Sequence, residues 1–154
     1  MRTSVLVLLV MSLSAVPAAA ETMVDATAPA ALLDVIRGYG GGTLETGEDG
    51  DPLIRGRIDG ESFVVYFYGC TNGAECRSVQ FTAAWQNPGT VGLAEVNGWN
   101  ANRRMSKAYI DDENDPVLEM DVNLDFGVTR RNFDDWVDYW QLALRTFTQD
   151  VLKQ

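Results

Sequence analysis

Residues 129–151 read TRRNFDDWVDYWQLALRTFTQDV, and this stretch predicts the helix on which the fold depends. Its large apolar residues recur at the 3.6-residue period and fall on one face of a helix. They are Phe133, Trp136, Val137, Trp140, Leu144, Phe147 and Val151. Thr129 or Asn132 can cap the amino end, where acidic residues are favoured. Docking this face on a sheet would bury its large aromatic side chains at on the order of 1.5–3 kcal/mol each, so we expect it to dominate the core.

The residues before this helix predict an antiparallel sheet. Leu44 begins a strand that is interrupted at 47–51 and resumes over 53–58, and Asp59-Gly60 forms a hairpin turn. Residues 63–68 are apolar on both faces, which is typical of a central strand covered on both sides. Further strands follow over residues 78–85, 108–110 and 117–124.

Two more helices complete the predicted order. The first starts near Thr27 and Pro29 and ends at the glycines 40–42, and the second fits residues 91–103. The expected fold is therefore α+β, with a single antiparallel sheet of about five strands and the order α-β-β-β-α-β-β-α.

The first twenty residues predict a secretory signal peptide. Arg2 supplies a positive charge, residues 5–13 form a short apolar run, and the alanines at 18–20 precede Glu21. We expect cleavage between Ala20 and Glu21. The apolar run is too short to span a membrane.

Three segments are therefore expected. Residues 1–20 form the signal peptide that is cleaved off, residues 21–27 a flexible N-terminal lead, and residues 28–154 a single domain. The protein is expected in the periplasm or secreted.

The net negative charge of the chain argues against some classes of binding partner. Removing 20 of the 154 residues, with Arg2 among them, takes the formal net charge from −10 to −11. Such a field repels phosphate backbones and anionic lipid, so we expect no nucleic-acid partner and no membrane insertion. The chain contains no histidine, which removes Ser–His and Cys–His nucleophile pairs and nearly all zinc and copper sites. We expect no cofactor, no catalytic residues and no metal ligands.

Cys70 and Cys76 flank a turn that contains Asn72-Gly73. In an exported protein two such cysteines should form a disulfide. A redox function is the alternative, but the chain has no C-x-x-C spacing that would lower a thiol pKa. We therefore expect a structural bond that contributes about 2 kcal/mol.

Several segments together resemble the YbjN-domain family. They read VNGWN at 96–100, RRM at 103–105, AYID at 108–111 and DPVLEMD at 115–121. The segments VYFYGC at 65–70 and SVQF at 78–81 resemble its exported members, and the resemblance runs from about Leu32 to Phe147.

This resemblance implies a fold like that of type III secretion chaperones, which commonly pairs into dimers and holds partner polypeptides. The family is also labelled a sensory-transduction regulator. The resemblance supplies no catalytic residues.

The candidate interaction surface comprises Trp99, Arg103, Tyr139 and Leu142. Trp99 and Arg103, with Asn97 and Asn100, can present a polar-aromatic patch on the second helix. The alternative, which we favour, is that Trp99 packs on the sheet while the asparagines bond local backbone. Tyr139 and Leu142 lie on the otherwise polar back of the last helix and suggest a dimer or partner surface. Arg130-Arg131 can receive an acidic partner, but exposed ion pairs are the commoner role of such residues.

Acidic residues suggest two alternatives. The turn 111–115 invites a calcium site, but Pro116 and Val122 stand where an EF-hand needs glycine and glutamate, which leaves a looser site with Glu48, Asp49 or Asp51. Glu119 and Asp121 project from one strand face about 7 Å apart, a spacing compatible with an inverting glycosidase.

The sequence thus favours a non-enzymatic, exported protein-interaction or chaperone-like module, with a homodimer as a further expectation. The alternative is an acidic-face small-ligand or calcium-binding protein, or a hydrolase.

Overall fold

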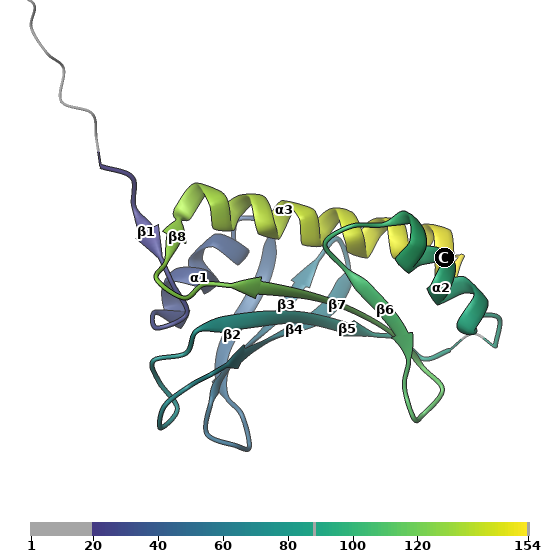
Figure 1. Ribbon diagram of the computed structural model, residues 1–154, viewed down its shortest axis with the longest axis horizontal. Helices are drawn as coiled ribbons and strands as arrows, with labels where there is room; N and C mark the ends of the chain where they lie inside the picture. The colour runs from purple at the N-terminus through teal and green to yellow at the C-terminus, as the bar shows by residue number, and fades with distance from the viewer. Residues whose placement is uncertain (1–19, 88, 154) are drawn as a thin grey trace, which may run out of the picture.

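The computed structural model describes residues 20–87 and 89–153 (Figure 1). The predicted signal peptide, apart from Ala20, lies outside the described residues. None of the helices in this described part has the length and apolar composition of a membrane span.

The described residues form an α+β fold with three α-helices, a six-stranded antiparallel sheet and a small two-stranded sheet. In chain order the elements are β1 (Met23–Val24), α1 (Pro29–Ile36), β2 (Gly40–Thr46), β3 (Pro52–Ile58), β4 (Glu61–Tyr68), β5 (Ser78–Ala84), α2 (Leu93–Asn102), β6 (Lys107–Ile110), β7 (Pro116–Asn123), β8 (Val128–Thr129), α3 (Arg130–Phe147) and the π-helical turn η1 (Thr148–Leu152).

The main sheet has the strand order β2-β3-β4-β5-β7-β6, and every neighbouring pair is antiparallel. Figure 1 shows α3 and α1 on one face of this sheet and α2 beside β6. No described helix covers the opposite face, which we call the outer face. The molecule therefore has a helix layer over one side of a single sheet.

The strand predicted to run from Leu44 to Ile58 is two strands, so the expected count of about five was wrong. Residues 47–51 close a hairpin in which the Gly47 N–H donates to the Asp51 carbonyl at 2.8 Å. Gly50 supports this turn with a φ of +89°, a conformation that glycine adopts without steric cost. The sequence pattern correctly marked an interruption but not that the chain reverses there.

Residues 21–27, expected as a flexible lead, differ from that expectation. Met23 and Val24 pair with Thr129 and Val128, and the Arg130 N–H donates to the Thr22 carbonyl at 2.7 Å. Val24 and Ala26 are buried in the core. A two-residue strand is too short to produce a readable alternation, so the sequence carried no signal for it.

The core forms where α3 crosses the sheet, as the helix pattern predicts. The Trp140 ring lies 5.9 Å from Phe63 and 5.6 Å from Phe81. Phe147 lies between Trp85, at 5.2 Å, and Trp99, at 5.1 Å. These centroid distances are typical of stabilising aromatic pairs.

The central strand β4 is covered on one face only, so the expectation of cover on both faces was wrong. Phe63, Val65 and Phe67 are buried under the helices, whereas Tyr66 and Tyr68 are 40% and 47% exposed on the outer face. Tyrosine reads as apolar in a pattern, but its hydroxyl favours a wet surface.

The disulfide between Cys70 and Cys76 is present, as predicted. It closes the loop between β4 and β5, and Cys76 is buried in the core. Gly73 in this loop lies against the carbonyl of Gly50, because a Cβ at Gly73 would be only 2.5 Å from that oxygen. The closed loop therefore packs against the β2–β3 turn.

Candidate functional site: a cleft between α2 and α3

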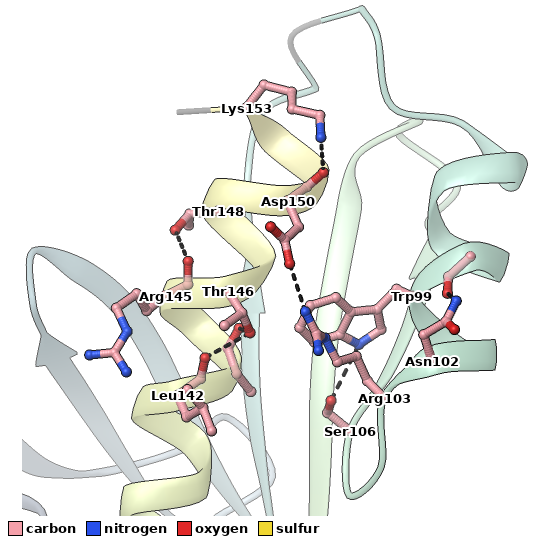
Figure 2. Close-up of polar contacts among 12 residues, drawn as sticks. Trp99, Asn102, Arg103, Ser106, Leu142, Arg145, Thr146, Thr148, Asp150 and Lys153 are labelled. Carbon is pink, nitrogen blue, oxygen red and sulfur yellow. Dashed lines mark hydrogen bonds and ion pairs between the residues drawn. The ribbon is translucent and has the colours of Figure 1, made fainter.

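Figure 2 shows the end of α2 and the loop into β6 beside α3. A cleft of about 140 Å³ lies between them. We call it the α2–α3 cleft. Its lining residues are Trp99, Arg103, Arg104, Met105, Ser106, Met120, Tyr139, Leu142, Ala143 and Thr146. An apolar cavity of ~150 Å³ is large enough to take one benzene ring, so the cleft matches a single apolar side chain in size.

The floor of the cleft is part of the rigid core. Trp99 is 4% exposed and meets the Phe147 ring edge-on, with 85° between the two ring planes. Its Nε1–H donates to the Ser106 hydroxyl at 3.3 Å, so the indole is held at both ends. Met120, from β7, is also buried.

Side-chain bonds to the backbone position α2. The Asn100 amide donates to the Ala108 carbonyl at 2.9 Å and accepts from the Ala108 N–H at 2.8 Å, which joins α2 to β6. At the other end, the Glu95 carboxylate accepts the Gly92 N–H at 2.9 Å. This helix buries only Val96 and Trp99, so these bonds supplement a small apolar face.

One wall of the cleft carries exposed apolar side chains. Tyr139 and Leu142 on α3 are each 45% exposed, and Met105 on the α2–β6 loop is 43% exposed. Methionine is flexible and polarizable, and it is common at surfaces that adapt to varied partners.

The rim of the cleft is cationic. The Arg103 guanidinium lies 5.2 Å from the centroid of the Trp99 ring and pairs with the Asp150 carboxylate at 2.7 Å (Figure 2). The Lys153 ammonium donates to the Asp150 carbonyl. Arg104 is exposed and forms no ion pair with another described residue. In a chain of net charge −10, this local positive charge favours an anionic group.

The structure brings all four residues of the predicted interaction surface to this cleft. Trp99 lies there as a buried floor residue, as the packing interpretation predicts, and not as an exposed patch. The pattern did not identify Met105 or Met120. Met120 lies on the buried face of β7, but nothing in the pattern of a single strand tells which buried residue lines a cleft.

The acidic pair of the outer face is engaged in a bonded network. Glu119 is 8% exposed, accepts the Tyr109 hydroxyl at 2.9 Å and pairs with the Lys107 ammonium at 2.9 Å. The Gln80 amide donates to the Asp121 carboxylate at 2.8 Å. Glu119 and Asp121 were expected on one strand face, and they share the outer face, but the neighbours of Glu119 bury it.

These contacts raise the pKa of two groups. Burial, followed by the hydrogen bond to Glu119, raises the pKa of Tyr109 to about 12. The hydrogen bond to Glu119 also raises the pKa of Lys107.

The looser calcium site would need acidic residues from two turns, and these turns lie far apart. The turn at 47–51 follows β2, whereas the turn at 111–115 precedes β7, and the sheet register places them at opposite ends of the sheet. Asp111 accepts the Glu113 and Asp115 N–H groups of its own turn. No group of three or more His, Cys, Asp or Glu side chains among the described residues is arranged to hold a metal ion.

Comparison with known protein families identifies the family of this chain. The model of the YbjN family, described as "Putative bacterial sensory transduction regulator", matches residues 29–153. No curated protein and no solved structure matches the chain significantly. The match covers all three α-helices and the whole main sheet. The chain therefore belongs to the YbjN family.

Proposed function

We propose that this protein is a non-enzymatic, exported polypeptide-binding module that holds an apolar side chain of its partner in the α2–α3 cleft. The observation that carries the proposal is the cleft itself. Residues 99–106 and 139–146 are distant in sequence, yet they meet around one apolar hollow with a cationic rim.

The chemistry of the cleft defines the partner. An apolar side chain seated between Trp99, Met120 and Leu142 would contribute on the order of 1.5–3 kcal/mol through burial. An acidic residue close to it in the partner chain would reach Arg104, whose guanidinium has no ion pair within the described chain. The partner motif is therefore an apolar residue next to an acidic one. A role in signal transduction, as the family description has it, is compatible with binding.

Selection from a random peptide library tests this proposal. We expect enriched peptides to carry an apolar–acidic motif and to bind the wild-type protein with micromolar affinity. Leu142→Arg should abolish binding, because it fills the cleft and adds charge. Leu93→Arg is the matched control, since Leu93 is an exposed helical leucine outside the cleft, 71% exposed. Peptides that bind both variants equally would contradict the proposal.

Arg104→Glu separates the charge contribution from the apolar one. It should weaken the binding of peptides that contain the acidic residue about tenfold to a hundredfold and leave the binding of neutral analogues nearly unchanged, because one charge-assisted hydrogen bond contributes ~1.5–3 kcal/mol.

The export part of the proposal rests on the signal-like start of the sequence and on the disulfide. Cell fractionation with thiol labelling tests it. We expect a processed chain beginning at Glu21, with Cys70 and Cys76 protected from alkylation. An intact precursor in the cytosol with both thiols free would show that it is wrong.

A further inference from the structure

The two edges of the main sheet are protected to different degrees. The edge strand β6 has four residues, carries Lys107 and lies beside α2. The opposite edge, β2, has seven residues, six of them exposed, in an unbroken register with β3. It contains no lysine, proline or bulge, the features with which proteins usually block edge pairing. This edge is therefore open to another strand.

The hydrogen bonds around β2 show which backbone groups are free. The Gly47 N–H donates to the Asp51 carbonyl, so odd-numbered residues bond toward β3 in the alternating antiparallel ladder. The Gly42 carbonyl instead accepts the Arg37 guanidinium, at 3.2 and 3.1 Å, and so points away from β3. The residues whose N–H and C=O groups point outward are Gly40, Gly42, Leu44 and Thr46.

We propose that β2 pairs antiparallel with β2 of a second copy of this chain, across a two-fold axis that passes between the two copies of Thr43. The main sheet then continues from one copy into the other. In this register Gly40 faces Thr46 of the second copy and Gly42 faces Leu44, and the reverse pairs follow by symmetry. Each of these outward pairs exchanges two hydrogen bonds.

Side chains on the outer face support this register. Thr43 faces Thr43 of the second copy, and cross-strand pairs of β-branched residues stabilise a sheet. Glu45 faces Gly41 of the second copy. An added Cβ at Gly41 would meet nothing within 4 Å, so the space beside Gly41 is open to the Glu45 side chain. Arg57, the partner of Gly41 on β3, forms no ion pair within the described chain. It would lie two strand spacings, about 9.5 Å, from Glu45 of the second copy, within reach of an ion pair.

This complementarity favours a second copy over another polypeptide. Within its own copy the Glu45 carboxylate accepts Arg55 at 2.9 Å and the Thr43 hydroxyl at 3.1 Å. Each carboxylate oxygen has a further lone pair, so Glu45 can accept Arg57 of the second copy as well, once on each side of the axis. No like charges face each other in this register. The contact is the same patch on both subunits and closes as a dimer. The Gly42 carbonyl already accepts two N–H groups of the Arg37 guanidinium, so one of these two bonds is replaced when the new backbone N–H binds.

Opposite-charge variants test the axis position. We expect the wild type to sediment as a dimer, and Thr43→Lys or Thr43→Glu alone to weaken association about tenfold or more, because each places like charges face to face. An equal mixture of the two variants should restore the dimer, since opposite charges then meet. Thr90→Lys, in an exposed loop, is the matched control and should remain dimeric.

Hydrogen exchange gives a second readout. The amides of Leu44 and Thr46 should be protected in the wild type and lose protection in Thr43→Lys, whereas those of Thr43 and Glu45, bonded to β3, stay protected in both. A monomeric wild type, or a mixture that fails to reassociate, would overturn the proposal. Both single variants should still bind the cleft peptide, so failure of the dimer and failure of the cleft are distinguishable.

Discussion

Gly56 shows how a single residue sets the packing of the sheet. A Cβ at this position would lie 2.3 Å from Cζ of Phe63, its cross-strand neighbour, because the aromatic ring lies over the glycine. Gly56→Ala should therefore lower the free energy of unfolding by about 1–3 kcal/mol through overpacking. Gly41→Ala, on the same sheet, meets nothing within 4 Å and should change it by less than about 0.5 kcal/mol. Urea denaturation measures both, and equal effects would contradict the packing argument.

The network around Glu119 predicts a response to alkaline pH. In the folded protein the pKa of Tyr109 is raised from its ordinary value of 10.0 to about 12. The stabilisation that this shift provides is complete below pH 10 and is lost as the pH rises from 10 through about 12. Tyr109→Phe should make the fall in the free energy of unfolding over this window shallower. It should also remove part of the late tyrosinate absorbance, leaving the contribution of Tyr39, whose pKa burial also raises to about 12. An unchanged late titration would show that burial and the bond to Glu119 do not raise the pKa of Tyr109.

At the residue scale the sequence predicted the members of the cleft better than their arrangement. Tyr139 and Leu142 were identifiable because they interrupt a polar helix face. Trp99 and Arg103 were identifiable from their spacing on a short helix. These four residues meet because α3 crosses β7 toward α2. The periodicity of a single helix carries no information about such a crossing.

Among the elements, α3 contributes most to the core, and its residues are not equivalent. Phe147 is fully buried between two tryptophans, whereas Trp136 is only partly buried and lies beside Tyr139 at 6.2 Å. Phe147→Ala should cost about 3–5 kcal/mol of stability. Trp136→Ala should cost clearly less, although both belong to one sequence stripe. Chemical denaturation of the two variants decides this, and a reversed order would contradict the packing of α3.

The helices were easier to predict from the sequence than the short or glycine-rich strands. The helices α1 and α3 were predictable because their apolar residues recur on one face over successive turns. The helix α2 was expected at 91–103 and lies at 93–102, although it buries only Val96 and Trp99. β2 was obscured because its glycines show no alternation, and its pairing with β3 depends on a turn conformation at Gly47–Asp51. β1 and β8 are too short for any pattern.

In the whole molecule the two proposed surfaces lie at opposite ends of one sheet. The α2–α3 cleft adjoins β6 and β7, while β2 forms the other edge. A dimer through β2 would therefore carry its two clefts at the two far ends of the continued sheet. Two linked binding events on one partner increase the overall affinity without any new contact when the geometry allows both.

The central claim is that the α2–α3 cleft receives a partner side chain, and methionine-methyl NMR tests it most directly. Met105 and Met120 line the cleft, whereas Met23 lies in β1, at the other end of α3 (Figure 1). On titration with a selected apolar–acidic peptide, we expect the methyl signals of Met105 and Met120 to shift in a saturable way while that of Met23 stays fixed. Unshifted cleft methyls at saturating peptide, or a shift confined to Met23, would contradict the account.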